Sequence, residues 1–277
     1  MPVLLIDYIW HHAVNDQHKL NNVLASSAKQ TQHEQLHAIE ADIVYSEAKS
    51  QSVMGHPPQV DGELTLASLL QQVHQAKFQF QQLPTCDTKF QILKLDFKSM
   101  KALKSSMNDI ENYLEELPPC LHQHVWINAD ILLGPGGDQG EDLQPKFHAD
   151  EFMELLATET SMTKSTTLSI GWTTSLTDIR APYTKDMVDD MITLLRPYPN
   201  KIITFPIRAS SFRLSFEALR RLLDENKKWT LTLWWSLTSE QHKLTKEEMN
   251  WIHELLESSD QSLRDRTYYD VVNFSPP

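Results

Sequence analysis

Charged and polar side chains recur on alternate residues of three short apolar stretches of this sequence. They are Glu40 and Asp42 in the first stretch, Lys94, Asp96 and Lys98 in the second, and Asn128 and Asp130 in the third. Because residues two apart on a strand share a face, each set points to one side of its strand, with apolar residues on the other. Clustered carboxylates and lysines are typical of sites that bind a cation and a phosphate group. The alternative is a network of internal ion pairs, in which the lysines neutralise the carboxylates.

Two histidines could add proton transfer to such a site. His12 follows the apolar run at the start of the chain, residues 4–10, and His56 lies in the loop Val53-Met-Gly-His-Pro-Pro58, where it could face His12 across a metal ion. Carboxylate oxygens are hard ligands that select Mg²⁺ or Ca²⁺ over zinc. These groups fit displacement at a phosphodiester, in which one histidine attacks or acts as base and the other protonates the leaving oxygen. His11 is interpreted as the outward neighbour of His12. The histidines interpreted as surface or helix residues are His18, His33, His37, His74, His122, His242 and His253.

Short apolar runs alternate with amphipathic stretches along the chain. Eight runs of strand type cover residues 4–10, 36–44, 90–97, 124–131, 167–173, 201–207, 229–235 and 268–271. Helical patterns cover residues 15–29, 65–82, 99–116, 147–159, 184–196, 210–225 and 245–257. Thr65, Thr184 and a capping box from Thr245 to Glu248 mark helix starts. Eight strands alternating with helices predict an α/β fold, a single (β/α)8 TIM barrel. A doubly wound open sheet is the alternative, but its glycine-rich phosphate motif is missing after the first strand.

Composition narrows the functional classes. The chain has 277 residues, of which 40% are hydrophobic, and a formal net charge of −12. This acidic balance disfavours stable nucleic-acid binding, and no stretch approaches the roughly 18 apolar residues of a membrane span. Nothing in the composition divides the chain, so we expect one domain over residues 1–277. Cys86 and Cys120 are isolated and predict thiols rather than a disulfide or a zinc site, which fits a cytoplasmic protein without a signal peptide.

Eight blocks of the sequence carry a family resemblance. They are Trp10-His-His-Ala13, Ile39-Glu-Ala-Asp42, Gly55-His-Pro-Pro58, Leu93-Lys-Leu-Asp-Phe-Lys98, Trp126-Ile-Asn-Ala-Asp-Ile-Leu132, Ser169-Ile-Gly-Trp-Thr-Thr174, Ile203-Thr-Phe-Pro-Ile-Arg208 and Leu231-Thr-Leu-Trp234. In this order they resemble the menorin-like family, in its branch without a signal peptide or membrane anchor. That family is similar to the glycerophosphodiester phosphodiesterases and the spider-venom phospholipases D, which are (β/α)8 barrels of the phospholipase C-like phosphodiesterase type.

The resemblance implies a metal site and a catalytic set. It places Mg²⁺ or Ca²⁺ on Glu40, Asp42 and Asp96, and makes His12, His56 and Lys98 the catalytic residues. The chain departs from the phosphodiesterase motifs where Ala13 replaces an arginine and Pro57 replaces an acid; Lys94 or Arg208 could replace the arginine. The candidate substrate-binding and phosphate-binding residues are Lys94, Asn128, Asp130, Arg208, Trp172, Trp234 and Tyr268. For the tryptophans, packing within the barrel is the alternative.

The predicted function is that of a divalent-metal-dependent phosphodiesterase of the glycerophosphodiester phosphodiesterase or phospholipase D type. Its substrate would be a small-molecule, lipid or nucleotide phosphodiester, attacked by water or by a hydroxyl of the substrate itself to give a cyclic phosphate. Two alternatives stay open. One is a non-catalytic interaction protein, since the menorin-like relatives include a component of an adhesion complex. The other is a protein that binds a phosphate ligand through a metal ion without turnover.

Overall fold

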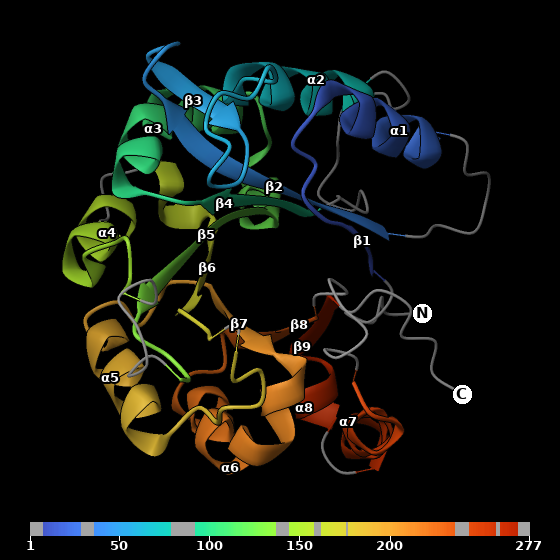
Figure 1. Cartoon of the computed structure of the whole chain (residues 1–277), viewed down its shortest axis with the longest axis vertical. Coiled ribbons are helices and arrows are strands. Elements are labelled where there is room, and N and C mark those ends of the chain that lie inside the picture. The colour runs from blue at the N-terminus through green and yellow to red at the C-terminus, as the bar shows by residue number, and fades with distance from the viewer. Residues whose placement is uncertain are drawn as a thin grey trace. The chain divides into compact units, whose positions relative to one another are not determined.

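Strands and helices alternate along the chain (Figure 1). The computed structural model describes residues 8–28, 36–78, 92–136, 144–157, 162–175, 177–235, 244–258 and 261–270. The strands are β1 Tyr8–His11, β2 Leu36–Ser46, β3 Gln51–Met54, β4 Ile92–Phe97, β5 Val125–Leu132, β6 Thr167–Trp172, β7 Ile203–Arg208, β8 Trp229–Trp234 and β9 Thr267–Asp270. The helices are α1 Gln17–Ala28, α2 Leu66–Phe78, α3 Met100–Glu115, α4 Ala149–Leu156, α5 Lys185–Leu195, α6 Ala209–Glu225, α7 Lys246–Ser258 and α8 Gln261–Arg264, with 3₁₀ helices at Pro119–His124 and Met162–Ser165.

The order of the strands defines the fold class. Hydrogen-bonded neighbours follow the order β1-β2-β4-β5-β6-β7-β8-β9, and β3 pairs off this path with β2 in antiparallel orientation. The pairs β2–β4, β4–β5, β7–β8 and β8–β9 are parallel. Parallel strands in this order with helices between them confirm the predicted (β/α)8 barrel. Each of the eight predicted strands that reaches the described residues is present, and β3 is the one strand that the apolar pattern does not predict.

The chain divides into two compact units. Unit 1 contains Met1–Tyr8, Asp130–Pro145 and Ser169–Pro277, and unit 2 contains Ile9–Ala129 and Lys146–Leu168. The expectation of one domain over residues 1–277 stays a prediction. No helix of the described residues is long and apolar enough to cross a membrane.

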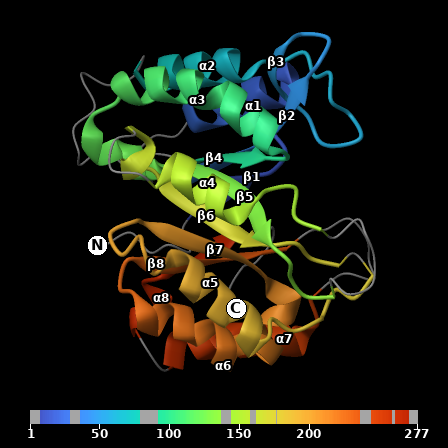
Figure 2. The same cartoon turned by 90° about the vertical axis from the view of Figure 1, so that its left-hand side faces the viewer.

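In unit 2, the alternation of side chains along β2 and β4 separates a core face from a polar face. Ile39, Ala41 and Ile43 are at most 1% exposed, and β4 buries its own apolar residues in the same way. The parallel register places Glu40 beside Lys94 and Asp42 beside Asp96. Helices α2 and α3 pack against each other in this unit (Figure 2). The polar residues singled out in the sequence therefore lie at matching levels on neighbouring strands.

Aromatic rings form much of the core of unit 1. The ring centre of Trp172 lies 5.4 Å from that of Tyr183 and 6.1 Å from that of Phe205, and Phe205 in turn contacts Trp229 at 5.5 Å. Gly171 allows close packing here, because a Cβ at this position would lie 2.8 Å from a ring carbon of Pro206. Trp172 is 2% exposed, so its ring is packed in the core of this unit. Packing of this kind is the alternative to a substrate-binding role for this residue.

The predicted helix starts are confirmed by hydrogen bonds. Thr65 accepts one from the backbone N–H of Ser68 at the start of α2, and Thr184 accepts one from Met187 at the start of α5. At α7 the Thr245 hydroxyl accepts from the N–H of Glu248, whose carboxylate accepts from the N–H of Thr245. These bonds satisfy N–H groups that the first turn of a helix leaves without partners.

The cysteines differ from the prediction. Cys120 is disulfide-bonded, so the expectation of a thiol at this position is wrong. Cys86 lies outside the described residues. Isolated cysteines give no spacing signal for a disulfide, because the distance between them is set by the fold. Since disulfides persist in oxidising environments, the cysteines no longer support a reducing compartment.

Candidate functional site

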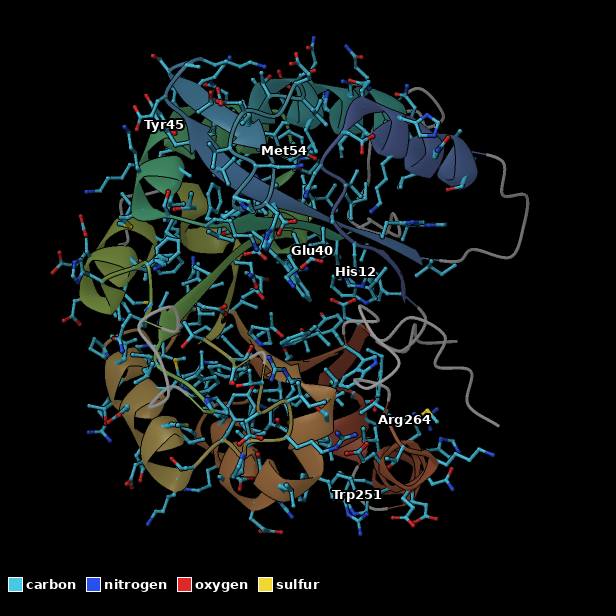
Figure 3. All side chains as sticks on the ribbon, in the orientation of Figure 1. His12, Glu40, Tyr45, Met54, Trp251 and Arg264 are labelled. Carbon is cyan, nitrogen blue, oxygen red and sulfur yellow. The ribbon has the colours of Figure 1, made fainter. Side chains whose placement is uncertain are left out.

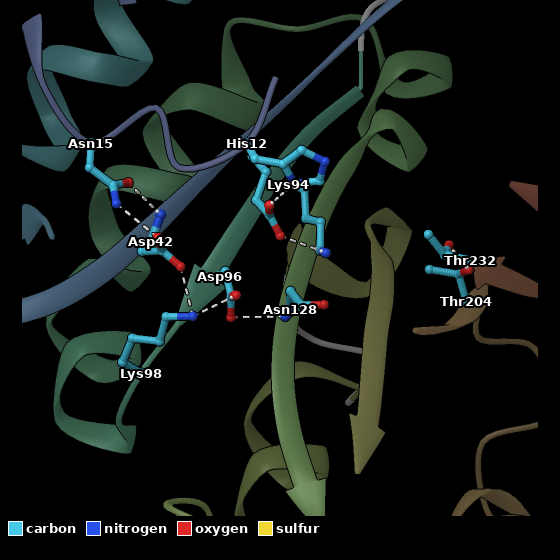
Figure 4. Close-up of polar contacts among 10 residues, drawn as sticks. His12, Asn15, Asp42, Lys94, Asp96, Lys98, Asn128, Thr204 and Thr232 are labelled. Carbon is cyan, nitrogen blue, oxygen red and sulfur yellow. Dashed lines mark hydrogen bonds and ion pairs between the residues drawn. The ribbon is translucent and has the colours of Figure 1, made fainter. Parts of the chain in front are cut away.

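Glu40 lies at the centre of one group of polar side chains in unit 2. Its Oε2 is 2.6 Å from Nδ1 of His12, and its Oε1 accepts a hydrogen bond of 2.8 Å from Nζ of Lys94 (Figures 3 and 4). The Lys94 side chain is 5% exposed and that of Glu40 is 14% exposed, so this is an ion pair largely removed from water. Glu40 thus joins the segment that follows β1 to strand β4 through one carboxylate.

Lys98 joins two further carboxylates, Asp42 and Asp96. We call this group of side chains the cluster; its members are His12, Glu40, Asp42, Lys94, Asp96, Lys98 and Asn128. Nζ of Lys98 lies 2.7 Å from Oδ1 of Asp42 and 2.7 Å from Oδ2 of Asp96 (Figure 4). Asn128 completes this group, because its Nδ2 donates a hydrogen bond of 2.8 Å to Oδ1 of Asp96. Two carboxylate oxygens from neighbouring strands therefore point at one cationic atom.

Trp10 supports the cluster from β1. Its ring stacks beside the imidazole of His12 with centres 6.5 Å apart and contacts Trp126 at 5.7 Å. Nζ of Lys94 lies 5.9 Å from the centre of the same indole ring. A cation near an indole face is stabilised by the ring quadrupole, so Trp10 adds both packing and a favourable interaction with Lys94.

The cluster shifts the pKa values of its members. Burial alone would raise the pKa of Glu40, but Lys94 and His12 outweigh burial and hold it well below its ordinary value. Burial alone would lower the pKa of Lys98, but Asp96 and Asp42 keep it above its ordinary value. Glu40 is therefore a carboxylate and Lys98 an ammonium at neutral pH. An ionised Glu40 accepts the Nδ1 proton of His12, which assigns proton transfer at this histidine to Nε2.

The donor set fits a divalent cation of the Mg²⁺ or Ca²⁺ type. All three predicted ligands, Glu40, Asp42 and Asp96, are hard oxygen donors, and two of them already converge on one cationic atom, Nζ of Lys98. The three carboxylates face two ammonium groups, so the cluster has one negative charge more than its lysines neutralise. The same contacts form the internal ion-pair network that is the structural alternative for these residues.

Of the three predicted catalytic residues, His56 is the one that the cluster does not include. Its backbone lies close by, since the N–H of the preceding Gly55 donates to the carbonyl of Asp42 at 3.0 Å. Its side chain is exposed, and Nδ1 is 2.8 Å from the carbonyl oxygen of Pro57. Within the residues that the structure describes, His56 therefore contacts its own loop and not His12.

The remaining candidate residues lie in unit 1. Arg208 is 5% exposed, donates from NH1 to the carbonyl of Ser175 at 2.6 Å, and has its guanidinium 5.3 Å from the ring centre of Trp234. Burial lowers the pKa of Arg208, and nearby Tyr183 and Asp130 partly oppose this. Asp130 is exposed, although Asn128 on the same strand is 5% exposed. Tyr268 packs edge-on against Tyr8, with the ring centres 6.0 Å apart.

Three features of unit 2 are missed by the sequence interpretation. Asn15, the first residue of the predicted helical stretch 15–29, lies in the loop before α1 and makes two hydrogen bonds to Asp42. His37, interpreted as a surface residue, is 3% exposed and its Nδ1 lies 2.8 Å from Nε2 of His11. His122, interpreted in the same way, is 5% exposed and bonds Ser165 and two backbone carbonyls. Each of these contacts joins residues that are distant in sequence or lie in irregular segments.

Comparison with known proteins identifies the family. The family model described as the Menorin N-terminal domain matches residues 5–275 of the chain. The chain belongs to this family. The human protein FAM151B is 29% identical to this menorin-family chain over 269 residues, which cover 95% of the chain and 82% of FAM151B. The resemblance stated from the sequence blocks is thereby confirmed.

Proposed function

We propose that this menorin-family chain is a divalent-cation-dependent phosphodiesterase of the glycerophosphodiester phosphodiesterase or phospholipase D type. The observation that carries the proposal is the hydrogen bond between Nδ1 of His12 and the ionised Glu40, at 2.6 Å. A carboxylate that fixes the Nδ1 tautomer makes the opposite nitrogen of a histidine a stronger base, which is the arrangement used in acid/base catalysis. The neighbouring carboxylates and lysines add the charges that phosphate chemistry needs.

The cation would be held by Asp42 and Asp96, with Glu40 as the third carboxylate. When bound, Mg²⁺ or Ca²⁺ neutralises charge on the phosphoryl oxygens. Lys94 and Lys98 are the positive side chains of the same cluster, and we assign them to the phosphate group as well. Asn128 keeps Asp96 oriented through its 2.8 Å hydrogen bond. Fixed charges of this kind stabilise the transition state because they require no reorganisation during the reaction.

In the proposed reaction, an oxygen nucleophile attacks phosphorus and the ester bond to the leaving oxygen breaks. Nε2 of His12 takes the proton of the nucleophile, which is water or a hydroxyl of the substrate. His56 gives a proton to the leaving oxygen. The exposed side chain of His56 has to turn from Pro57 toward the substrate for this step. The backbone bond from Gly55 to Asp42 keeps the start of this loop next to the cluster.

Phosphorus NMR of reaction products tests the proposed activity. The full-length protein would be incubated with Mg²⁺ or Ca²⁺ and a panel of lysophospholipids, glycerophosphodiesters and nucleotide phosphodiesters. We expect turnover of one class, loss of about 100-fold or more in His12→Ala, and a smaller loss in His56→Ala. His18→Ala, at an exposed position of α1, is the matched control. Variants His12→Ala and His56→Ala that both match the wild type would show the assigned roles to be wrong.

Isothermal titration calorimetry tests the cation. We expect Mg²⁺ or Ca²⁺ to bind the wild type and to bind Asp42→Ala at least about 10-fold more weakly, because a carboxylate ligand is lost. Equal binding by the wild type and Asp42→Ala would remove the cation from the proposed site.

A protein without turnover that binds a phosphate ligand or a partner is the second candidate. The observation that favours it is the exposed position of His56, which leaves the cluster without a second histidine to protonate the leaving oxygen. Binding of Mg²⁺ and inorganic phosphate without products from any panel member would support this candidate over the enzyme. A cytoplasmic location stays a prediction from the sequence, and the disulfide at Cys120 counts against it.

A further inference from the structure

The segment that follows His12 turns back onto β2. Ala13 has a φ of 47°, in the left-handed region that non-glycine residues rarely adopt. The N–H of Val14 then donates to the carbonyl of Glu40 at 2.8 Å, and the Val14 side chain is fully buried. This turn brings Asn15 against Asp42.

Asn15 contacts Asp42 through both ends of its amide. Its Oδ1 accepts a hydrogen bond of 2.9 Å from the backbone N–H of Asp42, and its Nδ2 donates one of 2.8 Å to Oδ2 of the same residue (Figure 4). Only one orientation of the amide satisfies both contacts, because the flipped group would set N–H against N–H and oxygen against carboxylate. The amide therefore fixes one carboxylate oxygen of Asp42, while the other, Oδ1, lies 2.7 Å from Nζ of Lys98.

Anchoring of the loop does not account for these contacts. The backbone bond from Val14 to Glu40 and the burial of Val14 already hold the turn on β2. A tie to the strand would need only the bond from the Asp42 N–H. The second bond, to Oδ2, acts on the side chain of Asp42 and sets the direction of its carboxylate.

We propose that Asn15 is a positioning residue that aims the Asp42 carboxylate at the cationic position shared with Asp96. Its effect on turnover rests on the proposed function. Its effect on the direction of Asp42 does not, because that direction is reported by Lys98. A side-chain ammonium held by two carboxylates exchanges its protons slowly and gives an ordered ¹H–¹⁵N signal, whereas a mobile ammonium does not.

The first measurement is the Lys98 ammonium signal in the full-length protein, assigned by its absence in Lys98→Arg. We expect the signal in the wild type and in Asn22→Ala, an exposed asparagine of α1 that serves as control. We expect it to be lost or broadened in Asn15→Ala at a temperature where that variant is folded. A Lys98 signal that is unchanged in folded Asn15→Ala would overturn the proposal, whatever the activity of the protein.

The second measurement separates positioning from anchoring by kinetics. Asn15→Asp keeps the acceptor for the Asp42 N–H but sets a carboxylate against Oδ2, whereas Asn15→Ala removes both bonds. Positioning predicts that Asn15→Asp loses more kcat than Asn15→Ala, with losses of about 10- to 100-fold and KM within about twofold. Anchoring predicts the reverse order. A larger loss of kcat in Asn15→Ala than in Asn15→Asp would therefore contradict the proposal. If the wild type turns over no substrate, the proposed function fails while the Lys98 signal still decides the role of Asn15.

Discussion

The imidazole Nδ1 of His12 lies 2.6 Å from Oε2 of Glu40, whose other oxygen accepts a hydrogen bond from Lys94. Glu40 therefore has two functions that can be separated by substitution. It orients the histidine that follows β1, and it neutralises an ammonium group that is almost fully buried. The second function is measurable without knowledge of the substrate.

Glu40→Gln is expected to lower the free energy of unfolding by about 3 kcal/mol, because Lys94 is left buried without its counter-charge. The double variant Glu40→Gln/Lys94→Met should recover much of this loss, since it removes both charges. Urea denaturation measures both. As a control, Glu47→Gln breaks an exposed pair with Lys101 and should change stability by less than about 1 kcal/mol. If the losses in free energy of unfolding from the two single substitutions simply add in the double variant, Glu40 and Lys94 do not stabilise each other as a buried pair.

Stability should depend on pH through His11. Burial, followed by the nearby charges of His37, His12 and Lys19, lowers the pKa of His11 from 6.5 to about 4. Between pH 6.5 and about 4, His11 therefore binds a proton in the unfolded chain but not in the folded protein. The free energy of unfolding is expected to fall as the pH is lowered through this range and to level off below about pH 4. The expected loss is about 1–2 kcal/mol, since the ring is only partly buried.

Urea denaturation of His11→Gln across this pH range tests that origin. The glutamine amide can keep a hydrogen bond to His37 but does not titrate. The free energy of unfolding should therefore change less with pH in His11→Gln than in the wild type. His18→Gln, at an exposed position, should keep the slope of the wild type. An unchanged slope in His11→Gln would assign the pH dependence to another group.

Reduction of the disulfide at Cys120 should lower the melting temperature of the wild type, by an amount equivalent to about 2–4 kcal/mol, because a cross-link restricts the unfolded chain. Thermal unfolding with and without dithiothreitol measures this. Cys120→Ser should melt at the temperature of the reduced wild type and should not respond to the reductant. A wild type that is equally stable under both conditions would show that the disulfide adds nothing to stability.

The hydroxyls of Thr204 and Thr232 form a buried pair in unit 1, with their oxygens 2.7 Å apart (Figure 4). Thr204→Val leaves the Thr232 hydroxyl without this partner and should cost about 1–3 kcal/mol. Thr204→Val/Thr232→Val should be closer to the wild type than either single variant, because neither hydroxyl of the pair is left buried without its partner. Chemical denaturation of the three variants gives the coupling energy, and a coupling of zero would show that the hydrogen bond is unimportant.

The sequence was sufficient to predict what depends on local periodicity. The alternation of Glu40 and Asp42 with apolar neighbours predicts a strand with one polar face, and the structure has that strand. The capping box at Thr245 is equally local, and it is present. The number and order of such elements were enough to predict the barrel.

Contacts between irregular segments could not be predicted. Asn15 follows a residue pair with no strand or helix pattern, and its contact with Asp42 depends on the left-handed turn at Ala13. Strand β3, Gln51–Met54, has only two apolar residues, Val53 and Met54, so it forms no apolar run. The disulfide at Cys120 and the pairing of His11 with His37 depend on how distant segments meet. The sequence interpretation also expected His56 to face His12, but a loop residue has no periodicity to set its direction.

Because His12 and Lys94 each contact one carboxylate oxygen of Glu40, the order in which these three residues can be replaced during evolution is restricted. A lineage that loses Lys94 first leaves a buried carboxylate with only His12 to balance it, and one that loses Glu40 first leaves a buried ammonium. Each first step reduces stability, whichever residue changes. Positions 12, 40 and 94 are therefore expected to be kept together or replaced together among relatives, so that divergence at one of them marks a branch in which the whole arrangement has been given up.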